Sequence, residues 1–277
     1  MFFSLALVAS LALVVAVVAG PAQHAAQPPV GSPQSKPLPL ILARDNIDGF
    51  VARSHSNGHE TMPYRLFAPS GYSAQKKYPL IVWLHGRGGV GRDNARQILG
   101  DQIAGTRTWT QPANQAKYPA FVLAPQSPGG WTAQRPTNAS PDALSAPLAL
   151  VVEILDSLEH ELSIDRHRIY VAGQSDGGYG VWDLITTRPE RVAAAIVVCA
   201  VPGDPTRAAR IATMPIWVFQ GTADDVLLVT GSRRMVDAIE KAGGHPRYTE
   251  YKGAGHDVWT RSFAERGLVD WLFAQHN

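Results

Sequence analysis

Three side chains that could together carry out nucleophilic catalysis lie far apart in this 277-residue chain. Ser175 is the centre of Gly-Gln-Ser-Asp-Gly, a G-x-S-x-G pattern between an apolar run typical of a strand and an amphipathic stretch typical of a helix. Asp224 and His256 follow later predicted strands. A serine hydroxyl is a weak nucleophile unless a base takes its proton, and the base needs a carboxylate to orient it. The residue types therefore predict a Ser-His-Asp triad.

The small residues around Ser175 have a physical reason. A sharp turn from strand to helix forces the serine into a strained backbone conformation, and side chains at Gly173 or Gly177 would collide with the neighbouring strand and helix. The turn also presents Ser175 at the positive end of a helix. An ordinary serine in a glycine-rich turn would give the same pattern, so the rest of the chain must support the interpretation.

The order of the three residues gives that support. Ser175, Asp224 and His256 are separated by 49 and 32 residues, and each follows a strand that is expected to end at the same edge of a parallel sheet. Taken singly, Asp224 could cap a helix that begins near Val229, and His256 could be an ordinary loop histidine. The competing candidates for the triad acid are Asp225 and Asp204.

Two main-chain amides are predicted to stabilise an oxyanion. After the predicted strand at 80–84 comes the glycine-rich segment His-Gly-Arg-Gly-Gly, in which we expect the N–H of Arg87 to be one donor. The N–H of Asp176, directly after the nucleophile, would be the other.

The same glycine-rich segment contains a literal G-x-G-x-x-G at Gly86, Gly88 and Gly91. A dinucleotide site also needs an acidic residue at the end of the next strand to hold the ribose. That strand ends in Leu-Ala-Pro-Gln, so we expect no nucleotide cofactor.

Metal chemistry is not expected either. His55 and His59 are four residues apart, but an Asn-Gly turn between them removes the helical spacing that a zinc site would need. Glu159-His160-Glu161 lies at the polar end of a predicted helix and is interpreted as a solvated face. The single cysteine, Cys199, allows neither an intrachain disulfide nor a thiolate zinc cluster.

The elements that must position these residues alternate between strand and helix. Two runs at 50–55 and 64–68 flank Asn57-Gly58 and predict an antiparallel hairpin. A helix is expected with its N-cap at Ser140 and Pro141 at its first position. The alternation predicts a mostly parallel, doubly wound α/β sheet. Continuous apolar runs typical of parallel strands buried on both faces lie at 80–84, 120–123, 169–172, 195–198 and 216–219.

The ends of the chain and its charge set further limits. Residues 1–19 form an uncharged apolar run, interpreted as a signal peptide or, alternatively, an N-terminal membrane anchor. Residues 20–38 are proline-rich and predict a disordered linker, so the folded domain is expected to cover 39–277. With 25 Lys+Arg against 23 Asp+Glu and no basic block, nucleic acid is not an expected partner.

Together these motifs resemble the bacterial esterases and predicted peptidases of the α/β-hydrolase superfamily, which are similar to the hydrolase domain of prolyl oligopeptidases. The matching segments lie between residues 78 and 273. The resemblance implies an α/β-hydrolase fold, with Ser175 as nucleophile, Asp224 as acid and His256 as base. Two positions depart from the family pattern: Asp176 stands where such proteins often carry Met, and Gln220 where they often carry His.

The lengths of the connections bound the substrate. Only a short segment joins Val201 to Pro215, so no lid domain is expected, and residues 39–77 have room for a hairpin but not for a propeller. We expect an open cleft, walled by 101–118 and 127–140, for short-chain or polymer-borne esters. Three tryptophans could line it or could instead pack beneath these loops: Trp109, Trp131 and Trp259.

The resulting hypothesis is a secreted or periplasmic serine carboxylesterase, or a membrane-anchored, extracytoplasmic one if the N-terminal segment is not cleaved. Because the same triad cleaves amides, a serine peptidase of the prolyl-oligopeptidase type is an alternative. A third hypothesis is a non-catalytic extracellular binding module on the same fold. The sequence does not indicate an oligomeric state.

Overall fold

The computed structural model describes residues 46–132, 140, 142–201 and 203–277. The expected signal peptide or anchor, the expected linker and the expected start of the domain at residue 39 lie outside these residues. No helix among the residues described is both long and apolar enough to cross a bilayer.

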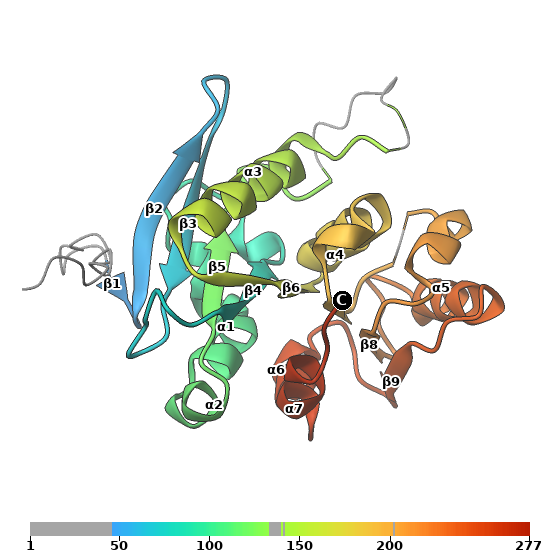
Figure 1. The fold of residues 1–277 in the computed structure, drawn as a ribbon. Helices are drawn as coiled ribbons and strands as arrows, with labels where there is room; N and C mark the ends of the chain where they lie inside the picture. The colour runs from blue at the N-terminus through green and yellow to red at the C-terminus, as the bar shows by residue number, and fades with distance from the viewer. Residues whose placement is uncertain (1–45, 133–139, 141, 202) are drawn as a thin grey trace, which may run out of the picture. The chain divides into compact units, whose positions relative to one another are not determined.

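A single sheet runs through the described part of the chain, in the order β1-β2-β3-β5-β4-β6-β7-β8-β9 (Figure 1). The first three strands and the β3–β5 pair are antiparallel, and the neighbours from β5 and β4 through to β9 are parallel. The predicted hairpin and parallel sheet are therefore confirmed. The strands are β1 (Asn46–Ile47), β2 (Phe50–Ser56), β3 (Thr61–Phe67), β4 (Tyr78–Leu84), β5 (Phe121–Pro125), β6 (Ile164–Gln174), β7 (Ala194–Val198), β8 (Ile216–Gly221) and β9 (Arg247–Tyr251).

The alternation of side chains along the strands builds a hydrophobic core on each face of the sheet. In β4, Leu80, Val82 and Leu84 belong to one core, and Ile81 and Trp83 to the other. Both faces are covered, which explains why the central strands read as continuous apolar runs.

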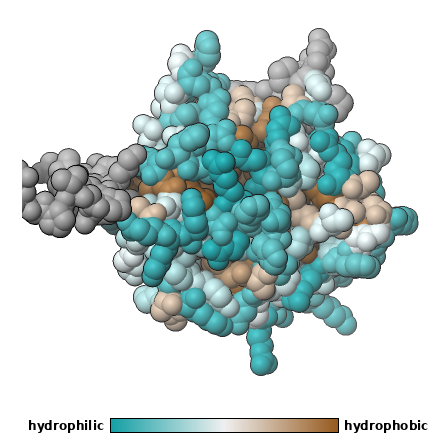
Figure 2. All heavy atoms as spheres, in the orientation of Figure 1, coloured by the Kyte–Doolittle hydropathy of each residue, from teal (hydrophilic) through white to brown (hydrophobic). Residues whose placement is uncertain are grey.

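Helices cover the two faces separately (Figure 1). The first core receives apolar residues of α3, α4 and α5, and the second receives residues of α1, α6 and α7. The helices are α1 (Ile103–Thr110), α2 (Pro112–Lys117), α3 (Ala146–Glu161), α4 (Asp176–Thr187), α5 (Val229–Lys241), α6 (Trp259–Phe263) and α7 (Leu268–Phe273). On the side of the molecule drawn in Figure 2, hydrophilic residues predominate and hydrophobic ones appear between them.

The start of α3 corrects one expectation. The helix begins at Ala146 after Ser145, with Pro147 in its first turn, and not at Ser140. Ser140 instead closes a turn, since its carbonyl accepts from the amide of Ala143 at 2.8 Å. Both serines are followed closely by a proline, so the N-cap pattern occurs twice in the sequence and does not distinguish the two sites.

Residues 101–118 also differ from expectation, because they form α1 and α2 instead of a loop along a cleft. Between β7 and β8, the described residues contain only the short 3-10 helix η6 (Pro205–Ile211), which agrees with the expected absence of space for a lid.

Candidate catalytic site

Ser175 lies at the junction between β6 and α4, in a backbone conformation that few residues other than glycine adopt. Its φ is 51° and its ψ is −119°. A Cβ at Gly177 would lie 1.9 Å from the carbonyl oxygen of Leu84, and one at Gly173 would lie 2.5 Å from the carbonyl oxygen of Gly177. The turn can therefore form only with glycine at both positions, and it places the serine side chain at the N-terminus of α4.

His256 joins the other two residues of the predicted triad. Its Nε2 lies 2.9 Å from Ser175 Oγ, and its Nδ1 lies 2.8 Å from Asp224 Oδ2. The imidazole is 17% exposed, while the carboxylate of Asp224 is fully buried. With Nδ1–H donating to the carboxylate, Nε2 is left as the acceptor that faces the serine hydroxyl.

The carboxylate of Asp224 is also held by its own loop and by β8. Oδ1 accepts the main-chain amides of Val226 and Leu227, at 2.9 and 2.8 Å. Oδ2, which faces His256, also accepts from Gln220 Nε2 at 2.7 Å. Asp224 therefore shapes the loop before α5, as the helix-cap alternative suggested, and contacts the histidine at the same time.

The competing acids occupy other positions. Asp204 caps η6, where its Oδ1 accepts from the amide of Thr206 at 3.0 Å. Asp225 is exposed. Of the three candidates for the triad acid, Asp224 is the one that contacts the imidazole of His256.

A buried histidine supports the glycine-rich loop after β4. His85 is fully buried, its Nδ1 donates to the carbonyl of Gly86 at 2.8 Å, and its Nε2 accepts from the amide of Ser127 at 3.0 Å. Burial lowers the pKa of His85 to about 4, so the ring is neutral at ordinary pH. Gln102 adds a further support by accepting from the Gly86 amide at 2.6 Å.

These contacts leave few amides of the loop free. The Gly86 amide is used by Gln102, and the Gly89 amide donates to the Gly86 carbonyl. Arg87 and Asp176 are the first residues of the 3-10 helix Arg87–Gly89 and of α4, positions whose amides have no partner within their own helix. Asp176 directly follows Ser175, and Gly86, before Arg87, lies against Gln174, so both predicted oxyanion donors belong to segments at the turn that carries Ser175.

The side chain of Asp176 lies in a partly buried position beside the nucleophile. The main-chain N–H of Trp131 donates to its carboxyl, but Oδ2 is buried with no hydrogen-bond partner among the described residues. Burial raises the pKa of the Asp176 carboxyl, and the nearby charge of Arg87 opposes the shift.

Comparison with known proteins identifies the family of this chain. The family described as "Putative esterase" matches residues 54–268. The chain belongs to this esterase family. It is thereby placed among the carboxylesterase-type hydrolases of the α/β-hydrolase fold.

Individual members and neighbours give further detail. "Probable feruloyl esterase C" from Aspergillus niger is 28% identical over 215 residues, which cover 74% of this chain and 70% of that protein. The crystal structure of a thermostable esterase superposes with a TM-score of 0.77 at 38% identity, and the match covers 83% of this chain and 64% of that one. The feruloyl esterase module from Clostridium thermocellum, complexed with sinapinate, has a TM-score of 0.60 over 85% of this chain and 93% of that one. Its 14% identity shows the fold alone.

Two of the three tryptophans considered for substrate binding are buried, as the packing alternative predicts. Trp109 is 1% exposed and packs edge-on against Phe263 between α1 and α6. Trp131 is fully buried, and its Nε1 donates to the carbonyl of His85 at 2.8 Å. Both side chains belong to the packed interior, where an indole buries a large apolar area. Trp259 is partly exposed, and its ring meets that of His256 edge-on at 5.5 Å.

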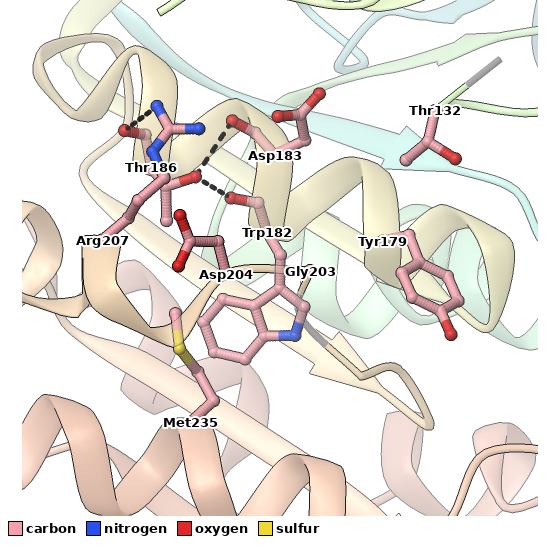
Figure 3. A pocket seen from close by; sticks show the side chains of 9 residues that line it. All are labelled: Thr132, Tyr179, Trp182, Asp183, Thr186, Gly203, Asp204, Arg207 and Met235. Carbon is pink, nitrogen blue, oxygen red and sulfur yellow. Dashed lines mark hydrogen bonds between the residues drawn. The ribbon is translucent and has the colours of Figure 1, made fainter. Parts of the chain in front are cut away.

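A cavity of about 340 Å³ runs along α4, the helix that begins at the nucleophile (Figure 3). Its apolar floor is made by Trp182 and Met235, and polar side chains surround it. Tyr179, one turn after Ser175, lies at one end. No local pattern in the sequence indicates this cavity, because its walls come from α4, α5 and the segment that leads into η6, which are far apart in the chain. The remaining lining residues are Thr132, Asp183, Thr186, Gly203, Asp204 and Arg207.

The potential metal ligands of the esterase are engaged in other contacts. Within the part of the chain that the structure describes, Cys199, Asp224 and His256 are the one group of three such residues with close ligand atoms. Burial raises the pKa of the Cys199 thiol to about 12, which makes it a poor ligand, and the other two residues bond to each other. His55 pairs with Glu153 at 2.9 Å, whereas His59 is exposed on the hairpin turn.

The acidic end of α3 corrects another expectation. Glu159 is not on a solvated face, since its side chain is only 6% exposed and pairs with Arg191 and Arg166 at 2.8 and 2.9 Å. Glu161 pairs with Arg53 of β2 at 2.6 Å. The segment therefore fastens α3 to its neighbours.

Proposed function

We propose that this chain is an exported serine esterase that cleaves carboxylic esters through a Ser175-His256-Asp224 triad and an acyl-enzyme intermediate. The observation that carries the proposal is the imidazole of His256, which spans 2.9 Å to the serine hydroxyl and 2.8 Å to the buried carboxylate. These are the distances that proton transfer from a serine nucleophile requires.

In the first half of the reaction, His256 takes the proton of Ser175 as the oxygen attacks the ester carbonyl. The carbonyl oxygen becomes an oxyanion, which the amides of Arg87 and Asp176 stabilise. His256 then returns the proton to the departing alcohol, and the acyl group stays on the serine. Removing one such oxyanion donor costs about 100- to 1000-fold in turnover.

In the second half, water takes the place of the alcohol. His256 accepts a proton from the water, the hydroxide attacks the acyl carbonyl, and the proton passes to Ser175 as the acid leaves. Asp224 keeps Nδ1 protonated throughout and stabilises the imidazolium. Since His256 must be neutral to accept a proton, activity is expected to fall in acid.

The proposed substrates are short-chain or polymer-borne carboxylic esters. Curated relatives are named probable feruloyl esterases, which supports an ester substrate. The cavity along α4 has an apolar floor and a polar rim, which suits a ring or chain that carries hydroxyl groups. Trp259 is proposed to contact the substrate beside the histidine.

The remaining parts of the proposal concern the chain ends. Residues 1–19 are proposed to direct export, residues 20–38 to link, and residues 39–277 to form the catalytic domain. The apolar, uncharged composition of the first segment supports export to the periplasm or the medium, or anchoring at the outer face of the membrane.

Labelling by a fluorophosphonate tests the mechanism directly. The parent protein is expected to be labelled and to hydrolyse nitrophenyl esters, and Ser175→Ala is expected to lose both properties while its thermal unfolding stays close to that of the parent. An unlabelled, folded parent would contradict the proposal and favour a binding module. Labelling combined with faster cleavage of peptide anilides than of esters would favour a peptidase.

A further inference from the structure

Gln220, at the end of β8, lies fully buried directly behind the triad acid. Its side-chain amide makes three hydrogen bonds. Nε2 donates to Asp224 Oδ2 at 2.7 Å and to the carbonyl of Leu227 at 3.0 Å, and Oε1 accepts from Ser232 Oγ at 2.9 Å. Both N–H groups and the oxygen of the amide thus have a partner, and only the second lone pair of the oxygen is unused.

These partners leave one possible orientation of the amide. If the group were flipped, its carbonyl oxygen would face both the carboxylate of Asp224 and the carbonyl of Leu227, and its NH2 would face the hydroxyl of Ser232. Two acceptors in contact with a third are strongly unfavourable in a buried site. The acceptors on Asp224 and Leu227 therefore set the direction in which Gln220 donates. The hydroxyl of Ser232, in the first turn of α5, lies 2.9 Å from the amide oxygen and 3.3 Å from the carbonyl of Ala200.

These hydrogen bonds join the two ends of the loop that carries Asp224. Gln220 belongs to β8 before the loop, Ser232 belongs to α5 after it, and Leu227 and Asp224 lie within it. Of the two carboxylate oxygens, Gln220 contacts the one that faces His256. A change at Gln220 therefore acts on the orientation of Asp224 rather than on the substrate.

We propose that Gln220, oriented by the carbonyl of Leu227 and supported by Ser232, is a positioning residue that holds Asp224 in the rotamer that accepts the Nδ1–H of His256. Because a glutamine amide does not titrate, it holds the carboxylate equally well over the whole pH range of the enzyme. This inference rests on the proposed function, since it assigns a role within the same triad. Gln220 does not contact the reacting atoms.

A pair of matched substitutions tests the proposal. Gln220→Met keeps the length of the side chain and removes both donors. Gln115→Met is the control, because Gln115 is also a buried glutamine with bonds to Trp109 and Ala120 carbonyls at 2.9 and 3.0 Å, far along the chain from the triad. Each variant removes a buried amide that makes hydrogen bonds, so a loss of folding stability is expected in both.

The readout is kcat and KM for a nitrophenyl ester, corrected for the active fraction by fluorophosphonate titration. We expect Gln220→Met to lose about 10- to 100-fold in kcat with little change in KM, which is less than the about 10⁴-fold lost when the histidine has the wrong tautomer. Gln115→Met is expected to keep the parent's kcat. Ser232→Ala is expected to lose a smaller factor, because Gln220 keeps its bond to Leu227.

The isosteric variant Gln220→Glu adds a pH signature and serves if Gln220→Met does not fold. A protonated Glu at this site can donate to Asp224, whereas an ionised one repels it. The variant is therefore expected to lose kcat as pH rises, over a range in which the parent is constant. The titratable groups around this position are Asp224, His256 beyond it, the Cys199 thiol and Tyr179.

The outcomes separate the two proposals. An inactive, unlabelled parent would overturn the esterase proposal itself. An active parent with equal kcat in Gln220→Met and Gln115→Met, or a Gln220→Glu variant with the parent's pH profile, would overturn the positioning role alone. Rescue of kcat by Gln220→His, which restores an N–H donor, would support it.

Discussion

Lowering the pH should reduce the stability of the folded protein, because His85 must be protonated. The sequence patterns gave His85 no role beyond its place in the glycine-rich loop. In the folded state its Nε2 accepts from the amide of Ser127, and a proton on that nitrogen would set two donors against each other at 3.0 Å. Burial lowers the pKa of His85 to about 4. In the unfolded chain a histidine has a pKa of about 6.5.

The sign and size of the effect follow from linkage. Because the folded pKa lies below the unfolded one, the unfolded state binds the proton first, and stability is lost as pH falls from about 6.5 to about 4. The full difference corresponds to about 3 kcal/mol, of which about 2 kcal/mol is lost between pH 7 and pH 5. The loss should loosen the loop that carries the Arg87 amide.

Urea unfolding followed by tryptophan fluorescence at pH 7 and pH 5 measures this loss. His85→Gln is expected to be less stable at pH 7 but to lose about 2 kcal/mol less than the parent on going to pH 5. His59→Gln, at the exposed hairpin turn, is the matched control and should keep the parent's pH dependence. Equal pH dependence in the parent and His85→Gln would refute the reasoning. So would a His85 imidazole resonance that titrates near pH 6.5, a measurement that needs no variant.

Three further predictions follow from burial and packing. Gly177→Ala should prevent folding or lower Tm sharply, because the added Cβ would lie 1.9 Å from a main-chain oxygen. Gly255→Ala is the control, since the space around Gly255 is open, and it should melt near the parent. Equal Tm values for the two variants would contradict the prediction. Trp109→Ala should cost about 3–5 kcal/mol of stability and leave KM unchanged. Trp259→Ala should raise KM with a smaller loss of stability. The reverse pattern would count against a core role for Trp109 and a substrate contact for Trp259. The Cys199 thiol, with its pKa raised to about 12 by burial, should not react with a thiol reagent in the native state and should react once after denaturation, so rapid native labelling would be inconsistent with the structure.

Much of the architecture could be predicted because its signals are local. A buried parallel strand reads as an apolar run, the Asn-Gly turn fixes a hairpin, and residues after parallel strands gather at one edge of the sheet. For this reason Ser175, Asp224 and His256 could be expected to meet before any distance was known. The glycines around Ser175 could also be interpreted from the sequence, because their spacing predicts a sharp turn in which a side chain would collide with the neighbouring backbone.

Features that depend on two distant segments could not be predicted. Whether a tryptophan lines a cleft or fills a core depends on what packs against it, and Trp109 and Trp131 met neighbours that no local pattern reveals. The start of α3 was misplaced because Ser140 and Ser145 offer equivalent local signals.

The amino-acid sequence by itself determined the order of strands and helices and the edge of the sheet at which chemistry could occur. Only the tertiary structure decided which acid faces His256, that Gln220 supports that acid from behind, and where the cavity along α4 lies. The physical reason is that secondary structure and strand-end position follow from periodicity along the chain, whereas hydrogen bonds of 2.7–2.9 Å between β8, its loop and α5 exist only after the chain has folded.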